Sequence, residues 1–397
     1  MRVTLAGTVA AALGPGPVGI AVSGGGDSVA LLVLAVRAGV AVAAATVDHG
    51  LRAASAAEAA GVAALCARLG VEHSILRWHW DGRGNLMEAA RDGRMALLAE
   101  WARGRGLPAV ALGHTADDVA ETFLMRLARR SGVDGLAAMA ARREAMGVTW
   151  LRPLLGVRRP ALRAMLRREG IGWVEDPTND DPAFGRTQAR RALAALAPLG
   201  IGAETLAAVA GHLAQVRAAL EAQTAAAAGL VFREAGGALA LDRAALAAQP
   251  EEVRRRLLDA AFRWIGGTAH GPRRADLARA AAAIAGGGAA TLHGARVLPG
   301  AGWIVRELRA AGGAVPVGAV WDGRWHVTGP PATVAALGAA GLADCPGWRS
   351  IGLPRAVLLA SPGVWDGARL LAAPVAGRPG AWRATMDAGF FATVKAD

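Results

Sequence analysis

Short apolar runs alternate with longer amphipathic stretches from residue 18 to about residue 168. This alternation is typical of α/β domains, in which helices connect buried strands and cover the sheet. The apolar runs predict strands at 18–22, 40–47, 74–78, 109–112 and 148–151, and the amphipathic stretches predict helices that include 55–69, 86–105 and 116–129. Connections of this kind favour a doubly wound parallel sheet.

The pattern changes near residues 197–200, where Ala-Pro-Leu-Gly interrupts it. Helical runs follow at 204–228 and 251–264, and from about residue 286 glycine, proline and tryptophan become frequent between short apolar runs. We therefore predict three domains. They are an α/β domain at 1–198, a helical module at 199–285 and a small β-rich domain at 286–397.

A glycine-rich loop joins the first predicted strand to the next helix. Its residues are Ser23, Gly24, Gly25, Gly26, Asp27 and Ser28. Three successive glycines let the backbone approach a phosphate, and the helix N–H groups beyond them favour an anion. A Walker A loop has a lysine before its Ser or Thr, whereas Asp27 stands here and would repel phosphate unless a cation intervened. The loop thus predicts ATP with Mg²⁺, and an ordinary glycine-rich turn is the alternative.

Other polar residues also follow predicted strands. Ligands of parallel sheets bind beyond the carboxyl ends of the strands, where the 23–28 loop, Asp48-His49 and Gly113-His114 all fall. We expect these three segments to converge on one cleft. His49 then contacts the nucleotide, although a purely structural histidine is the alternative.

The predicted helix after His114 carries several acidic residues near its start. Asp118 and Glu121 are three residues apart, so they share one face of a helix. Helix capping is the alternative role for acidic residues at this point, and it could explain Asp117. Capping does not explain why Glu121 should lie on the same helix face as Asp118, one turn further along. Two carboxylates at the mouth of a cleft suit a cationic substrate or a metal.

Basic residues accompany this predicted cleft. Arg91 and Arg94 lie three apart on a helix and could neutralise phosphate or pair with Glu88. An acidic, turn-rich loop at 176–182 could result from turn chemistry alone. The arginines that follow it are Arg186, Arg190 and Arg191. At the edge of the α/β domain they are suited to hold an RNA backbone.

Composition narrows the class of protein. The net charge of +12 comes almost wholly from arginine, since Lys395 is the only lysine. This charge suits a polyanion, although arginine bias can also reflect genomic base composition. Cys66 and Cys345 have no C-x-x-C spacing, which argues against a disulfide framework, a zinc site and thiol-based sulfur transfer. The apolar excess is mostly alanine, so we predict a cytoplasmic protein without a membrane span or a signal peptide.

Taken together, the motifs resemble those of the tRNA(Ile)-lysidine synthetases, members of the N-type ATP pyrophosphatase, or PP-loop, superfamily. The 23–28 loop indicates only the superfamily. The more specific stretches are 48–52, 114–136 with 126–132 inside it, 152–155 and 176–179. The resemblance is close over 18–192 and looser beyond. Thr187 and Met95 depart from the family pattern, which has an asparagine and an aromatic residue at these positions.

The resemblance implies ATP-dependent ligation of lysine to C2 of the wobble cytidine in a minor tRNA(Ile) with a CAU anticodon. The cytosine C2 oxygen would attack the α-phosphate of ATP, and the lysine ε-amine would then displace AMP. The implied catalytic residues are Asp27, which holds Mg²⁺ through the phosphates, and Asp118 and Glu121, which bind lysine. ATP would bind Ser23, Gly24, Gly25, Gly26, Asp27, Ser28, Asp48 and His49; Arg91 and His114 would stabilise the intermediate; tRNA would bind Arg186, Arg190, Arg254 and Arg273.

Several alternatives stay open. A tRNA thiolase of the same superfamily would generally need a pair of cysteines, and an amidating ligase would need a glutaminase segment or a partner subunit. A catalytically silent RNA-binding protein is disfavoured by the intact Asp27, Asp118 and Glu121. A homodimer is compatible with the sequence, which carries no self-complementary signature.

Overall fold

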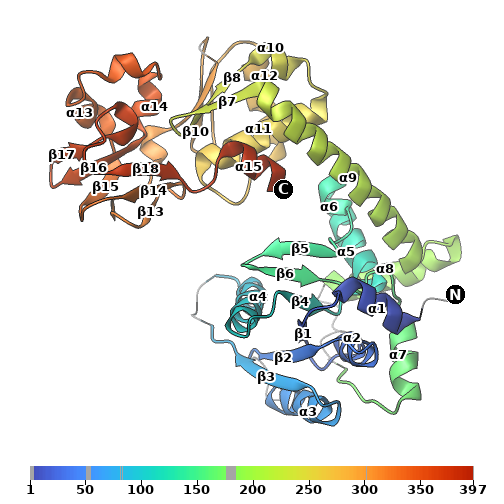
Figure 1. Cartoon of the computed structure of the whole chain (residues 1–397). Helices are drawn as coiled ribbons and strands as arrows, with labels where there is room; N and C mark the ends of the chain where they lie inside the picture. Colours follow the sequence, from blue (N-terminus) through green and yellow to red (C-terminus); the bar gives the residue numbers. More distant parts are fainter. Residues whose placement is uncertain are drawn as a thin grey trace. The chain divides into compact units, whose positions relative to one another are not determined.

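The structure is a computed structural model that describes residues 4–50, 55–80, 82, 84–175, 185–300 and 302–396. The chain forms two compact units, Met1–Arg217 and Ala218–Asp397 (Figure 1). The predicted division into three domains at 198/199 and 285/286 stays a prediction.

The first unit is built on one six-stranded sheet (Figure 1). Its strands are β1 (Val18–Ala21), β2 (Val42–Asp48), β3 (Glu72–Arg77), β4 (Ala109–Leu112), β5 (Arg142–Ala145) and β6 (Val148–Leu151). They follow the order β3-β2-β1-β4-β6-β5, and all neighbours are parallel except the β5–β6 pair. The predicted doubly wound parallel sheet is confirmed. The strand order changes direction at β1, which is where such sheets bind their ligands.

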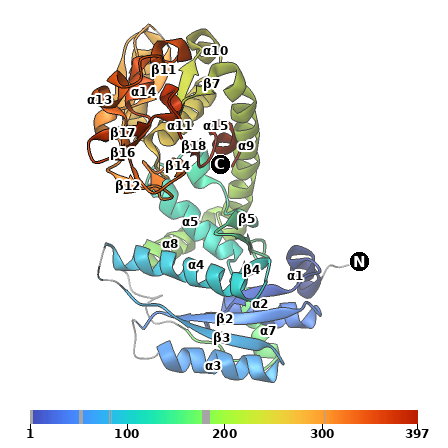
Figure 2. The same ribbon diagram turned by 60° about the vertical axis from the view of Figure 1, so that its left-hand side comes forward.

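Helices cover both faces of this sheet because alternate residues of its strands point to opposite sides. They are α1 (Leu5–Leu13), α2 (Gly26–Arg37), α3 (Ser55–Arg68), α4 (Leu86–Gly104) and α7 (Arg159–Arg168). Ile20 of β1 packs in the apolar core with α1, α2, α3 and α7. Its neighbour Ala21 packs in the core with α4 on the other face (Figure 2).

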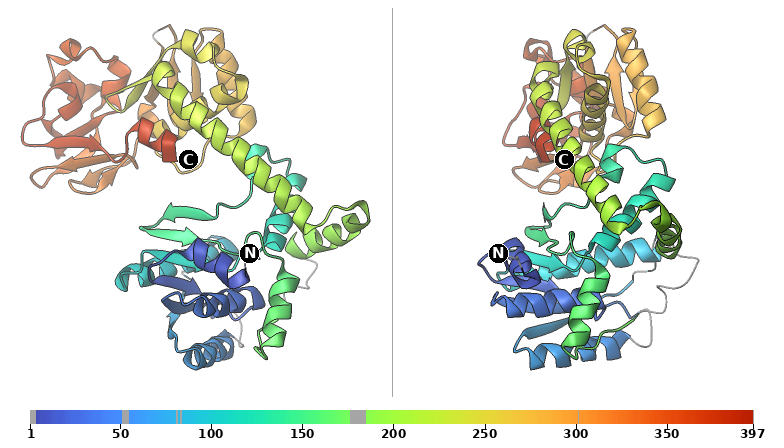
Figure 3. Two further views of the ribbon diagram at one scale, coloured as in Figure 1. Left: turned by 45° about the vertical axis from the view of Figure 1, so that its right-hand side comes forward. Right: turned by 90° about the vertical axis from the view of Figure 1, so that its right-hand side faces the viewer.

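Further helices of the first unit follow β4 and α7. They are α5 (Ala116–Ala128), α6 (Val133–Leu136), α8 (Gly185–Leu196), the 3₁₀ helix η2 (Ala197–Leu199) and α9 (Ala203–Val231). Apolar residues of α5, such as Val119 and Phe123, pack against Leu206 of α9. Helix α9 is one unbroken helix (Figure 3, yellow-green) that begins in the first unit and ends in the second.

Among the described helices, none alone has the length and apolar character to cross a membrane. The bent pair Gly185–Leu199 and Ala203–Val231 meets that test when its two parts are combined.

The second unit combines helices with three antiparallel sheets. Its helices are α10 (Arg243–Ala247), α11 (Glu251–Gly266), α12 (Arg274–Ala285), α13 (Gly338–Ala343), α14 (Arg355–Leu359) and α15 (Phe390–Ala396), with 3₁₀ helices η3 (Leu308–Ala310), η4 (Trp348–Ile351) and η5 (Pro374–Ala376). A hairpin of β7 (Phe232–Ala235) and β8 (Ala238–Leu241) joins β9 (Ala290–Leu292), β10 (Ala295–Leu298) and β11 (Trp303–Arg306) in the order β7-β8-β11-β10-β9. The mainly helical stretch therefore shares a sheet with the β-rich one.

The remaining strands form two smaller sheets in the second unit. One has the order β12 (Val315–Pro316), β15 (Thr333–Ala336), β16 (Pro362–Asp366) and β17 (Arg369–Ala372). The other has the order β13 (Val320–Trp321), β14 (Trp325–Thr328) and β18 (Arg383–Met386). Trp321, Val327 and Val364 pack together between them. The predicted β-rich character of this region is confirmed.

Candidate active site

The 23–28 loop leaves the end of β1 and starts α2. Gly25 is the N-cap of α2 and supplies no side-chain acceptor to the N–H groups of the first turn. The Ser28 hydroxyl donates to the Gly25 carbonyl oxygen at 2.9 Å and accepts from the Ser23 N–H at 3.1 Å. The serines thus hold the loop in shape while helix N–H groups are left for a ligand, as in known phosphate sites.

Close backbone packing fixes the loop against its neighbours. A Cβ at Gly113, just after β4, would lie 2.9 Å from the Ser28 nitrogen, so only glycine fits there. On the other side, the Val174 N–H donates to the Gly24 carbonyl oxygen at 2.9 Å. The segment before the acidic 176–182 loop therefore lies beside the phosphate loop.

The first turn of α5 presents Asp118 in a capping box. Its carboxylate accepts from the Thr115 N–H at 2.8 Å and from the Thr115 hydroxyl at 2.7 Å. Asp117 instead accepts from the Arg159 N–H at 2.7 Å and pairs with the Arg158 guanidinium. Capping thus accounts for Asp118 rather than for Asp117, which corrects the expectation from the sequence.

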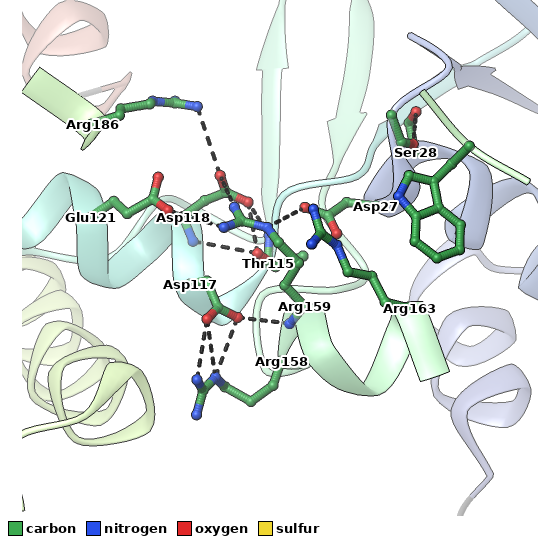
Figure 4. A network of polar contacts seen from close by, with 12 residues as sticks. Asp27, Ser28, Thr115, Asp117, Asp118, Glu121, Arg158, Arg159, Arg163 and Arg186 are labelled. Atoms are coloured by element: carbon green, nitrogen blue, oxygen red, sulfur yellow. Dashed lines mark hydrogen bonds and ion pairs between the residues drawn. The ribbon is translucent and has the colours of Figure 1, made fainter. Parts of the chain in front are cut away.

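One arginine joins all three predicted catalytic carboxylates (Figure 4). Arg159, the first residue of α7, donates from Nε to Asp27 at 2.9 Å, from Nη2 to Asp118 at 3.1 Å and from Nη1 to Glu121 at 3.1 Å. In Figure 4 its guanidinium lies between Asp27 on one side and Asp118 and Glu121 on the other. The predicted trio is therefore brought together, and Arg159 is the residue that sequence reasoning missed.

Two predicted tRNA-binding arginines also lie at this cluster. The Arg190 Nε donates to Glu121 at 2.7 Å, and the Arg186 guanidinium lies 3.8 Å from Asp118. The Glu121 side chain is only 1% exposed, and Arg159 and Arg190 are cationic groups that contact it.

Burial and the arginine act against each other on the carboxylates. Burial raises the pKa of Asp27, and the hydrogen bond and charge of Arg159 offset only part of that rise. Burial also disfavours the charged form of Asp118, but Arg159 and the Thr115 hydrogen bonds outweigh it and lower the pKa of Asp118. The same contacts outweigh burial for the guanidinium and raise the pKa of Arg159, so this side chain stays charged.

His114 lies at the edge of the cluster in an electropositive setting. Burial lowers the pKa of His114 to about 4; Asp118 opposes this shift, whereas Arg152, Arg94 and Arg186 add to it. Its ring is therefore uncharged at neutral pH, and its buried Nδ1 has no hydrogen-bond partner in the described parts of the chain.

Two carboxylate oxygens in the cluster have unused acceptor capacity. Oδ1 of Asp27 and Oε2 of Glu121 are buried and make no hydrogen bond with any of the described residues. Buried acceptors are normally satisfied, so these atoms indicate a place for a ligand. The described residues contain no group of three His, Cys, Asp or Glu side chains placed to hold a metal. Asp27 alone fits Mg²⁺ as a single protein ligand, which is how this ion usually binds beside phosphates.

The end of the second strand carries Asp48 and His49. Asp48 Oδ1 accepts from the Gly50 N–H at 2.9 Å, which forms a local turn. The half-buried His49 ring meets Trp78 edge to face at 5.8 Å between centroids, and its Nδ1 has no partner among the described residues. Arg91 is exposed, whereas Arg94 is partly buried. Burial lowers the pKa of the His49 and His114 rings, and the charge of Arg94 adds to both shifts.

Several other predicted positions have a simple structural setting. Met95 packs in the core with α4, and Thr187 is buried in α8, so both departures from the family pattern lie in packed positions. Arg254 donates to the Ala247 carbonyl oxygen at 3.2 Å, and Arg273 is exposed at the start of α12. The stretches 51–52 and 176–182 lie outside the described residues.

The chain is similar to known proteins over most of its length. A family model described as a PP-loop domain matches residues 6–197. The chain is 49% identical over 387 residues to the tRNA(Ile)-lysidine synthase of Ruegeria pomeroyi, which covers 94% of this chain and 92% of that protein. It is 43% identical over 378 residues to the enzyme of that name from Mesorhizobium japonicum, covering 86% and 80% of the two chains. These matches extend over both units.

Proposed function

The chain belongs to the tRNA(Ile)-lysidine synthase family, and we propose that it joins lysine to C2 of the wobble cytidine of tRNA(Ile) with ATP as the energy source. It is then a carbon–nitrogen ligase that releases AMP and pyrophosphate. One observation carries the assignment of the site to this reaction. Three carboxylates from α2 and α5 meet at one cationic group next to a phosphate-type loop.

The phosphate loop is the proposed ATP site. Its glycines and the N–H groups at the start of α2 suit the phosphates, and the unused Oδ1 of Asp27 suits Mg²⁺. Mg²⁺ bound there would offset the negative charge of the phosphates during adenylation. Asp48 and His49 follow the neighbouring strand β2, and we assign them to the nucleotide side of the cleft.

Asp118 and Glu121 form the proposed lysine site. An ammonium group needs several acceptors once it leaves water, and two buried carboxylates with an unused Oε2 supply them. The same carboxylates hold the side-chain amine near the nucleotide. This proximity favours its attack on the adenylated cytidine over attack by water.

His114 is proposed to contact the activated base. Because its ring is uncharged at neutral pH, it can make a hydrogen bond from Nδ1 without adding charge to a crowded cationic setting. The predicted role of Arg91 at the intermediate remains a proposal, with Arg94 as the more deeply placed of the pair.

The tRNA is proposed to approach along basic side chains. Arg186, Arg254 and Arg273 are assigned to its backbone, whereas Arg190 is assigned mainly to Glu121 because of its 2.7 Å hydrogen bond. Because ATP and tRNA are cytoplasmic substrates, we propose a cytoplasmic enzyme. A homodimer stays a proposal to be tested by measuring the mass in solution.

Incorporation of labelled lysine into purified transcripts tests the proposed function. We expect ATP-dependent labelling of tRNA(Ile) with a CAU anticodon and none of tRNA(Met) with the same anticodon. Pyrophosphate release with another acceptor, without lysine incorporation, would favour another PP-loop enzyme. Binding of tRNA with neither labelling nor pyrophosphate release would favour a catalytically silent RNA-binding protein.

A further inference from the structure

Arg159 donates hydrogen bonds to all three carboxylates that the proposed function assigns to two different ligands. Its Nε holds Asp27, the residue assigned to Mg²⁺, and its two terminal nitrogens hold Asp118 and Glu121, assigned to lysine. The Arg159 side chain is 17% exposed, so these contacts are made largely out of water. One guanidinium thus spans both halves of the site.

The placement of Arg159 is set by the core rather than by the cluster. Leu162, Met165 and Leu166 of α7 are buried in the core that α7 shares with α2. The start of α7 is also fixed, because the Arg159 N–H donates to Asp117 at 2.7 Å. The backbone of Arg159 is therefore anchored independently of the contacts that its side chain makes with the three carboxylates.

The incoming cations would share these carboxylates with the Arg159 side chain. At Asp118, Arg159 Nη2 holds Oδ1 and Thr115 holds Oδ2, so a lysine ammonium that binds Asp118 as well as the unused Oε2 of Glu121 would have to replace the hydrogen bond from Nη2. Mg²⁺ at the unused Oδ1 of Asp27 would lie on the same carboxylate as Arg159 Nε, which holds Oδ2, and would repel the guanidinium. Three cationic groups crowded among three carboxylates would repel one another at short range.

We propose that Arg159 is a positioning residue that holds the three carboxylates in the ligand-free site and is displaced by the substrates, so that it couples the binding of ATP with Mg²⁺ to the binding of lysine. This inference rests on the proposed function of Asp27, Asp118 and Glu121. Loss of the Asp27 contact leaves Arg159 with fewer partners, and lysine then displaces it more easily. Coupling of this kind is reciprocal, so each ligand strengthens the binding of the other.

Binding measurements on the full-length protein test the coupling without any turnover. The dissociation constant of L-lysine is measured by calorimetry with and without Mg²⁺ and α,β-methylene-ATP, which cannot release pyrophosphate. For the unchanged protein we expect the nucleotide to tighten lysine binding roughly tenfold. For Arg159→Met we expect tight lysine binding already without nucleotide, and a ratio between the two conditions close to one.

The neighbouring arginine supplies a matched control. Arg158 lies at the same helix start but pairs with Asp117 and with Glu204 at 3.6 Å, not with the three carboxylates of the cluster. Arg158→Met should therefore keep the coupling of the unchanged protein. If Arg158→Met abolished the coupling as completely as Arg159→Met, the effect would belong to the helix start and the proposal would fail.

Weaker lysine binding by Arg159→Met under both conditions would overturn the proposal, because Arg159 would then support the carboxylates in the bound state. If this variant does not fold, Arg159→Lys takes its place. Its single ammonium cannot span three carboxylates, so lysine should bind more tightly than to the unchanged protein without nucleotide, and unchanged or weaker binding rejects the idea. Failure of the proposed function looks different, since Glu121→Gln would then bind lysine as well as the unchanged protein.

Discussion

Each unit contains a buried cluster of carboxylate and arginine side chains. The two clusters differ in how completely their carboxylate oxygens are hydrogen-bonded within the protein. In the second unit, Asp322 accepts from Arg306 Nη2 at 2.7 Å and Nε at 2.9 Å, and from the Gly312 N–H at 2.9 Å. Arg324 lies 3.7 Å from the same carboxylate. Both oxygens of Asp322 are thus used within the protein, and its side chain is 2% exposed.

In the cluster of the first unit, the carboxylate oxygens are only partly used by hydrogen bonds. Three carboxylates surround Arg159, and Asp27 and Glu121 each keep a buried oxygen that has no partner within the part of the chain that the structure describes. A saturated cluster ties elements together, as Asp322 ties β11 to the β13–β14 hairpin. An unsaturated cluster beside a phosphate loop is suited to bind a ligand. Hydrogen-bond saturation of the carboxylate oxygens therefore separates a structural cluster from a candidate site of the same composition.

The largest effect is expected when the saturated cluster loses its carboxylate charge. Asp322→Asn keeps the shape and tolerates the positive φ of 53° at this position, but removes the buried carboxylate charge that pairs with Arg306 and Arg324. We expect the second unit to lose about 3–5 kcal/mol of stability in urea unfolding. Asp366→Asn is the control, because its pair with Arg369 is exposed and should contribute less than about 1 kcal/mol. A loss of stability below about 1 kcal/mol for Asp322→Asn would mean that the buried Asp322 cluster contributes no more than the exposed Asp366–Arg369 pair.

In the unsaturated cluster, removal of charge should affect catalysis rather than folding. Because burial raises the pKa of Asp27, its charge is held at a cost, and Asp27→Asn should leave stability within about 1 kcal/mol of the unchanged protein. We expect tRNA-dependent pyrophosphate release to fall roughly 10²–10³-fold while tRNA binding persists. Pyrophosphate release at the original rate would remove Asp27 from the metal site.

Glu121 distinguishes the two halves of the unsaturated cluster. Glu121→Gln keeps the hydrogen-bonding shape but loses the charge proposed to bind the lysine amine. We expect KM for lysine to rise roughly 10- to 100-fold, with a smaller change in KM for ATP. If lysine saturation stayed the same and ATP use collapsed, Glu121 would belong with Asp27 at the metal.

The sequence predicts the sheet better than it predicts the cluster. Strands β1, β4 and β6 are apolar and fully buried and β2 is apolar with a buried middle, so their runs stand out. The two edge strands differ, since β3 is partly exposed and β5 is polar and gives no such signal. The β7–β8 hairpin had a signal that was missed, since Gly236 and Gly237 form a two-residue turn with positive φ.

The candidate site divides in the same way. Their helical spacing predicted that Asp118 and Glu121 share one face of a helix. The glycine-rich loop predicted that Asp27 lies at a phosphate site. The role of Arg159 could not be predicted, because it is one of several arginines in its region and its contact residue Asp27 lies 132 positions away in the chain. Local patterns therefore predict the carboxylates, while tertiary packing supplies the cation that joins them.

The smallest predicted effect concerns His114, whose neutral ring belongs to the unsaturated cluster. Burial lowers the pKa of His114 to about 4, whereas in the unfolded chain the ring titrates near the ordinary value of 6.5. Between these values the unfolded chain binds the additional proton, so this contribution to stability is present above pH 6.5 and is lost as the pH falls toward 4. From pH 7.5 to 5.5 the unchanged protein should lose about 1 kcal/mol more stability than His114→Gln in urea unfolding. Equal losses would mean that the native state takes up the His114 proton over the same pH range as the unfolded chain. The pKa of His114 would then not be lowered, and the cluster would not hold its ring in the uncharged form.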